Sequence, residues 1–178
     1  MGVRYTKTLN YPAGVDDVAK MLANPRFVQW AAKRSTPNGT IEAADVVPHD
    51  DGGFTVTVRR KLPIAMIPPQ FRPFVGSEIE LRQAEVWEPE AEGRRQGTVV
   101  QEIVGTPLIV TGTVDLEPVP EGSRQTYNGE IQLQLPSFAL MMMPRLIDSI
   151  AQAAMQPVDD ALARTEKAGH HWLAKRVG

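Results

Sequence analysis

The chain has 178 residues, a length typical of one domain, so we interpret residues 1–178 as a single domain. Its 19 basic and 21 acidic residues give a formal net charge of -2, which offers no global electrostatic reason to bind nucleic acid or an anionic membrane. It contains no cysteine, which excludes a disulfide scaffold, a thiolate zinc site, an iron–sulfur cluster and a cysteine nucleophile.

The N-terminal region predicts one strand followed by two short helices. Apolar and polar residues alternate from Val3 to Tyr11, which is typical of a half-buried strand. A first helix follows from Val15, where apolar residues recur at helical spacing. Asn24 and Pro25 then fit the N-cap and first position of a second helix.

The middle of the chain changes to a period of two residues, which predicts a series of strands. Short turns containing Gly, Pro and Asp separate the segments, so consecutive strands should form antiparallel hairpins. The expected strands lie near 40–48, 53–61, 78–88, 96–104, 108–117 and 124–135.

The last third returns to helical spacing and predicts a long helix over about 143–167, with an extension to Trp172 as the alternative. Pro157 should kink this helix. At ~1.5 Å per residue, 25 residues span about 37 Å, long enough to cover a sheet. The order of elements therefore predicts an α+β fold in which this helix covers one face of an antiparallel sheet.

Three segments carry a resemblance to a known family. They are 11–18 (YPAGVDDV), 24–30 (NPRFVQW) and 85–87 (EVW), in the context of consecutive strands and a long final helix. The chain resembles the START-like, polyketide-cyclase-type (SRPBCC) superfamily, and most of all an uncharacterised bacterial branch of it. The resemblance covers nearly the whole chain.

This resemblance implies the helix-grip fold: a curved antiparallel sheet of about seven strands around a long C-terminal helix, with two short helices after the first strand. It also implies an internal cavity that holds a hydrophobic or amphipathic small molecule or a lipid. The superfamily includes carriers, receptors, cyclases and hydroxylase subunits, so the fold does not select one activity.

Two apolar segments are candidate walls of such a cavity. The segment from Leu62 to Phe74 is apolar and rich in proline, so it is either a loop packed flat on the core or the mouth of a cavity that touches a ligand or a membrane surface. Phe138 and the methionines 141–143 precede the long helix. They either fill the core or form a ligand wall together with Met155.

Several polar residues fall on apolar strand faces. Without a bulge, Gln83 and Glu85 share a face with Trp87, and Arg60 follows an apolar series in the preceding strand. Gln101 and Lys7 interrupt apolar faces in the same way. A hollow interior with water or a polar ligand would explain these residues. The more ordinary explanation is a β-bulge that changes the register, or a side chain that snorkels at an edge.

Recognisable catalytic and metal motifs are missing. The histidines at 49, 170 and 171 lack metal-ligand spacing, and no nucleophile elbow, phosphate loop or dinucleotide fingerprint occurs. We therefore expect no metal and no cofactor. Glu85 is the one weak candidate for a catalytic residue, as a general base whose pKa burial would raise.

We predict a protein that binds or carries an apolar or amphipathic small molecule without catalysis. A cyclase- or dehydratase-like enzyme that uses Glu85 is the alternative, and an interaction module that docks through segment 62–74 on a protein or membrane is a further one. We expect no stable membrane insertion, a monomer or homodimer, and a cytoplasmic location, since no apolar stretch of signal-peptide length begins the sequence. The predicted ligand-binding residues are Trp30, Arg60, Met66, Phe71, Phe74, Gln83, Glu85, Trp87, Phe138, Met142 and Met155.

Overall fold

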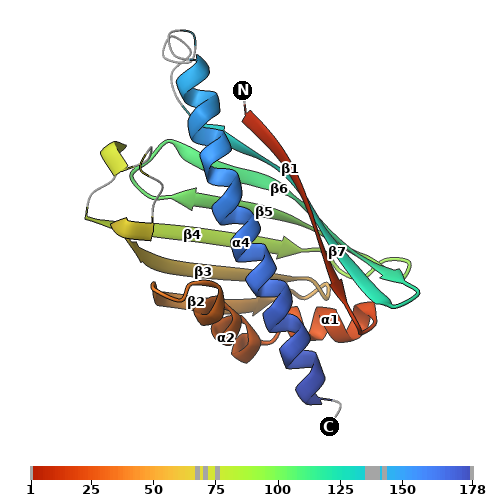
Figure 1. Ribbon diagram of the computed structural model, residues 1–178. Coiled ribbons are helices and arrows are strands. Elements are labelled where there is room, and N and C mark those ends of the chain that lie inside the picture. The colour runs from red at the N-terminus through yellow and green to blue at the C-terminus, as the bar shows by residue number, and fades with distance from the viewer. Residues whose placement is uncertain are drawn as a thin grey trace.

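The computed structural model describes residues 2–66, 69, 72–74, 77–134, 141 and 144–176. One curved antiparallel sheet forms a layer, and a long helix, α4, lies across one of its faces (Figure 1). Two short helices, α1 and α2, close one end of the same face. This is the helix-grip α+β fold that the sequence predicts.

The sheet has seven strands in the order β1-β7-β6-β5-β4-β3-β2, so β1 and β2 are its edges. Each strand from β2 to β7 pairs with its neighbour in sequence, and β1 completes the sheet by pairing with β7. The predicted strands are confirmed with small changes at their ends. Their bounds are β1 (Gly2–Tyr11), β2 (Thr40–Pro48), β3 (Phe54–Pro63), β4 (Glu78–Trp87), β5 (Arg95–Ile103), β6 (Leu108–Val119) and β7 (Gly122–Leu133).

The short helices begin where the sequence predicts. α1 (Val15–Leu22) carries two acidic residues in its first turn, where the helix dipole favours negative charge. α2 (Pro25–Ser35) starts with a proline, and the side chain of Asn24 accepts a hydrogen bond from the backbone N–H of Arg26 at 2.9 Å. Two 3-10 turns, Ile64–Met66 and Arg72–Phe74, lie in the proline-rich segment.

α4 (Pro144–Arg176) is longer than predicted and continues as a single helix through Pro157 (Figure 1). Its 33 residues span about 50 Å at ~1.5 Å per residue. Among the helices described, none combines the length and apolar character needed to cross a membrane.

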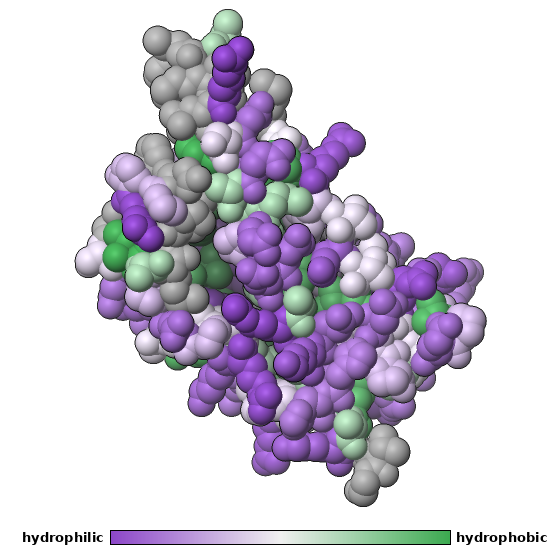
Figure 2. Space-filling view, in the orientation of Figure 1, coloured by the Kyte–Doolittle hydropathy of each residue, from purple (hydrophilic) through white to green (hydrophobic). Residues whose placement is uncertain are grey.

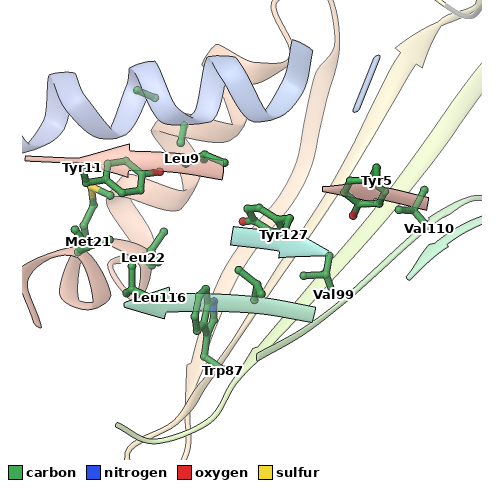
Figure 3. Packing of buried hydrophobic residues seen from close by; sticks show 14 of the residues in the cluster. Tyr5, Leu9, Tyr11, Met21, Leu22, Trp87, Val99, Val110, Leu116 and Tyr127 are labelled. Atoms are coloured by element: carbon green, nitrogen blue, oxygen red, sulfur yellow. The ribbon is translucent and has the colours of Figure 1, made fainter. Parts of the chain in front are cut away.

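α4 does not contact the sheet evenly. Its close backbone neighbours are β1, β7 and α2. Where its C-terminal half meets β1 and α1, the interior is filled, and Figure 3 shows Leu9, Tyr11, Met21 and Leu22 packed together there. Gly169 of α4 allows the ring of Tyr11 to come so close that a Cβ at this position would collide with it. Along β3, β4 and β5 the helix is separated from the sheet by a cavity, and this cavity is the candidate site.

The strand register decides which polar residues face the helix. β3 and β4 pair without interruption, so Arg60 lies opposite Leu81 and Glu85 lies opposite Val56. The ladder between β2 and β3 shifts register between Ile41 and Ala43 of β2, opposite Arg60 and Arg59, but the extra residue belongs to β2, and β3, β4 and β5 pair with one another without interruption. The explanation of the polar residues by a bulge in β3, β4 or β5 is therefore wrong. Their side chains lie on the covered face of the sheet because the alternation is regular.

Candidate functional site

A cavity of about 400 Å³ lies between the sheet and the middle of α4. Figure 2 shows a hollow with hydrophobic surface inside it, next to the polar exposed residues of the helix. The volume lies within the range of about 300–1,000 Å³ that is usual for small-molecule sites. Its apolar walls come from β3, β4, β5, β6 and α4, with a contribution from α2: they include Val56, Val58, Leu62, Leu81, Val99, Ile103, Leu108, Val110, Val158, Ala161 and Leu162, with Phe27 and Ala31 from α2.

Glu85 of β4 is the acid on the cavity floor. It is only 9% exposed, and three side chains donate hydrogen bonds to its carboxyl group. Trp87 Nε1 donates to Oε1 at 3.1 Å, while Gln83 Nε2 and Tyr127 Oη donate to Oε2 at 3.3 and 3.2 Å. Burial raises the pKa of Glu85, and the three donors partly oppose this by stabilising the carboxylate.

Tyr127 of β7 extends the polar contacts of Glu85 toward the filled end of the core. Gln125 Nε2 donates to Tyr127 Oη at 2.8 Å, so this phenol both accepts and donates a hydrogen bond. Burial, and then the nearby charge of Glu85, raise the pKa of Tyr127 well above its usual value. Tyr127 is therefore a neutral hydrogen-bond donor at any ordinary pH.

Arg60 of β3 is the buried cation of the site and is only 7% exposed, whereas Arg164 of α4, which also lines the cavity, is exposed. Its Nη1 donates to Thr36 Oγ1 at 2.7 Å and to Ser35 Oγ at 3.3 Å, both at the C-terminal end of α2. Its Nη2 donates to Gln83 Oε1 at 3.2 Å. Burial lowers the pKa of Arg60 to about 10, so the guanidinium remains charged near neutral pH.

These contacts form one continuous polar row on the cavity floor, and Gln101 of β5 and Asp160, Arg164 and Thr165 of α4 also line the cavity. The row runs from Gln125 through Tyr127, Glu85 and Gln83 to Arg60, and it connects β7, β4 and β3 to α2. Gln83 separates the buried acid from the buried base because its amide donates to one and accepts from the other. Such a floor could orient the polar end of an amphipathic molecule whose apolar part contacts the walls.

Four of the predicted site residues come together in this cavity: Arg60, Gln83, Glu85 and Trp87 all line it. Trp30 does not. It packs against Phe27 and Trp172, with ring centroids 6.2 and 5.7 Å away, and Arg34 stacks over it.

Met155 lies on α4 against the hydrophobic core and is not among the described residues that line the cavity. The predictions for Phe71, Phe138 and Met142 fall outside the described residues, as do those for the side chains of Met66 and Phe74. From the proline-rich segment, Leu62 lines the cavity.

Sequence reasoning did not find Tyr127, Thr36 and Ser35 as members of the site. The alternation of β7 placed Tyr127 on the covered face, but nothing in its strand pointed to an acid 42 residues away. Ser35 is the last residue of α2 and Thr36 follows it, and their contact with Arg60 depends on how that helix docks on the sheet. Among the residues searched, no cluster of three or more His, Asp or Glu side chains could hold a metal ion.

A family model described as "Protein of unknown function (DUF2505)" matches residues 6–173. The chain belongs to the DUF2505 family. Its fold is the helix-grip fold that the resemblance to the START-like (SRPBCC) superfamily implied.

An uncharacterized protein of Mycobacterium tuberculosis is 30% identical over 89 residues, which cover 49% of this chain and 51% of that protein. The chain thus spans about half the length of the curated relatives it matches.

Two solved structures have the same fold. The di-domain ARO/CYC StfQ from the steffimycin biosynthetic pathway has a TM-score of 0.61 at 14% identity. The match covers 100% of this chain and 52% of the StfQ chain. An uncharacterized protein from Rhizobium leguminosarum has a TM-score of 0.56 at 11% identity, and covers 96% of both chains. At these identities the likeness describes the fold alone.

Proposed function

We propose that this protein binds, and holds or carries, a hydrophobic or amphipathic small molecule in the cavity between α4 and strands β3, β4 and β5. The observation that carries this proposal is an apolar cavity of about 400 Å³ with a row of polar side chains on its floor. Burial of ligand surface would supply the affinity, at roughly 25 cal/mol per Å² before the costs of binding. The polar row would orient the ligand.

The test uses N-phenyl-1-naphthylamine, a neutral apolar dye whose fluorescence rises in a dry environment. Ala161 and Ala163 form a matched pair on α4, because Ala161 lines the cavity and Ala163 is exposed to solvent. We expect the wild-type protein to bind the dye and Ala161→Phe, which fills the cavity, to weaken binding about tenfold or more, equal to about 1.4 kcal/mol. Ala163→Phe should leave the affinity within about twofold. Equal effects of the two variants would contradict binding in the cavity.

A second experiment looks for the natural ligand. Native mass spectrometry of the protein purified from its own host should show an additional mass of a small molecule, which Ala161→Phe should lose. A wild-type protein that carries no additional mass and does not bind the dye would argue against the proposal.

A cyclase- or dehydratase-like enzyme is the second candidate, and one observation favours it. Glu85 lines the cavity, and burial raises the pKa of its carboxyl group toward the range in which a general base works near neutral pH. Three donors already hold this carboxyl group, however, and these contacts would have to give way when it accepts a proton from a substrate. The binding function is therefore the better supported of the two.

Glu85→Gln separates these candidates once a co-purified molecule is known. If Glu85 is a base, the variant binds the molecule and loses its conversion by a factor of about 10² or more. If the protein only binds, neither form converts the molecule. Unchanged conversion by the variant would remove Glu85 as the base. The third alternative, docking through segment 62–74, would be favoured by a filled interior, and the cavity that Leu62 lines therefore gives it less support.

A further inference from the structure

In the part of the chain that the structure describes, Arg60 forms no ion pair. Its three hydrogen bonds all go to neutral groups: two hydroxyl groups at the end of α2, and the amide oxygen of Gln83. Its Nε–H is buried and has no hydrogen-bond partner. A buried cation is costly unless an anion compensates it, so this arrangement is incomplete as it stands.

No Asp or Glu side chain pairs with Arg60; Asp160 of α4 also lines the cavity, but it is exposed and accepts a hydrogen bond from Gln156 Nε2 at 2.9 Å. Every Asp and Glu of the sequence lies in the ranges that the structure describes, and none of the ion pairs found there includes Arg60. Glu85 is the nearest acid along the polar row, but its oxygens bind three other donors and the amide of Gln83 stands between the two groups. The C-terminal end of α2 adds only the partial negative charge of a helix dipole.

The neighbouring residue shows that this is not a general lack of acids. Arg59 points to the opposite face of the same strand, where Glu80 of β4 lies 3.8 Å away. Lys61, on the same outer face, pairs with Glu42 and Glu78 at 3.3 and 3.6 Å. The chain thus provides acids for the basic residues on either side of Arg60 and leaves the inward one to the cavity.

We infer that the ligand of this cavity is an amphipathic organic anion, whose single negative head group, such as a carboxylate or sulfonate, binds Arg60 while its apolar body contacts the walls. This inference rests on the proposed binding function and specifies its ligand class. Arg60 suits the role because a guanidinium is weakly hydrated and binds planar anions through two parallel hydrogen bonds. The apolar body would lie against side chains such as Val56, Leu81 and Val158, which line the cavity.

Two dyes with the same aromatic body test this inference. 1-Anilinonaphthalene-8-sulfonate carries one negative charge, and N-phenyl-1-naphthylamine is the same molecule without the sulfonate. Fluorescence titration of the wild-type protein should give a dissociation constant at least about tenfold lower for the anionic dye, since the charge is the only added group. Equal affinities, or tighter binding of the neutral dye, would overturn the inference without a variant.

Variants of β3 then locate the preference. Arg60→Gln should weaken binding of the anionic dye about tenfold or more and change binding of the neutral dye by less than about threefold. Arg59→Gln removes the same charge from the outer face, and it should leave both affinities within about twofold. Arg60→Lys keeps the charge and should retain part of the preference even if Arg60→Gln does not fold. A preference that survives in folded Arg60→Gln would overturn the role of Arg60.

The outcomes distinguish the two proposals. The proposed function stands if the neutral dye binds the wild-type protein and Ala161→Phe weakens that binding. The anion inference nevertheless fails if the affinity for the anionic dye is the same in the wild type and in Arg60→Gln. If neither dye binds the wild-type protein, both fail.

Discussion

The two ends of the interior differ in how α4 meets the sheet. At one end, α4 packs against β1, β7 and α2, and large side chains such as Tyr11 and Met21 fill the space almost completely. At the other end, α4 faces β3, β4 and β5 across a cavity of about 400 Å³ whose floor contains an acid, a base and an amide. One sheet and one helix therefore provide a packed support and a hollow site.

The difference shows how a small fold reconciles stability with an empty interior. Empty space costs free energy because its walls lack partner atoms, so the packed end has to supply the cooperative core. At each end, a glycine without a Cβ leaves space for a tyrosine ring. Gly169 lies beside Tyr11 at the packed end, and Gly129 lies beside Tyr5, which lines the cavity. The following predictions test whether the ends differ in this way.

The largest expected effect is that of Leu9→Ala compared with Leu81→Ala. Leu9 is 0% exposed in the packed end, so its truncation should lower the free energy of unfolding by about 2–5 kcal/mol. Leu81 is half-buried and faces the cavity, so the same change there should cost about 1 kcal/mol. Urea denaturation of both variants measures the difference. Equal losses would mean that the cavity walls are packed as tightly as the core.

Gly169→Ala tests the close packing of α4 at the filled end. In an exposed helix interior this change would stabilise the protein by about 1 kcal/mol. Here the new methyl group would collide with the ring of Tyr11 and lie 3.2 Å from Met21 Cε, so we expect a net loss of about 1–2 kcal/mol. Ala163→Gly, at an exposed position of the same helix, measures the propensity term alone. A stabilised Gly169→Ala protein would show that Tyr11 moves aside easily.

Glu85→Gln tests the acid on the cavity floor through pH. Burial raises the pKa of Glu85 above its ordinary 4.5, so the folded protein holds a proton that the unfolded chain releases. Wild-type stability therefore falls as pH rises from about 4.5 to the raised pKa, with a slope of at most about 1.4 kcal/mol per pH unit from this group.

The Gln variant lacks that titration, so its free energy of unfolding relative to wild type should increase between pH 4 and pH 7. Denaturation of both proteins across this range measures this difference in the free energy of unfolding. The contributions of the other acids are the same in both proteins and cancel in the difference. A difference that does not change with pH would show that the three donors fully offset the burial of Glu85.

The smallest effect on the free energy of unfolding is expected for an ion pair on the surface, away from both the packed end and the cavity. Arg94 Nη1 and Glu117 Oε2 form an ion pair at 3.0 Å, with side chains 61% and 33% exposed. Solvent and salt screen such a pair, so Glu117→Gln should change the free energy of unfolding by less than about 1 kcal/mol and leave dye binding unchanged. Thermal unfolding at low and high salt checks this. A larger loss would place this part of the surface among the elements that support the cavity.

The sequence predicted the fold in most respects because the alternation of strands and the capping of helices are local properties. Asn24 and Pro25 mark the start of α2 by themselves, and the regular alternation of β4 places Glu85 beside Trp87. The partners of the site could not be read in this way. Thr36 contacts Arg60 from 24 residues away, and Tyr127 contacts Glu85 from 42 residues away, through the docking of α2 and the curvature of the sheet.

Trp30 is a predicted site residue that is not among those lining the cavity. Its position in a short amphipathic helix was compatible with a cavity wall, but Phe27 and Trp172 surround it instead. Trp172 lies in the last turns of α4, within the extension that was predicted as the alternative end of this helix. Its contact with Trp30 depends on how α2 packs against α4, which helical spacing alone does not predict.

The amide of Gln83 has a fixed polarity with a structural consequence. Its N–H end meets the carboxyl group of Glu85 and its oxygen meets the guanidinium of Arg60. Rotation of the amide by half a turn would bring two donors together at the arginine and two acceptors together at a carboxylate, so neither neighbour tolerates it. The side chain therefore bridges Glu85 and Arg60 in one orientation only. A leucine of similar size could not form either hydrogen bond.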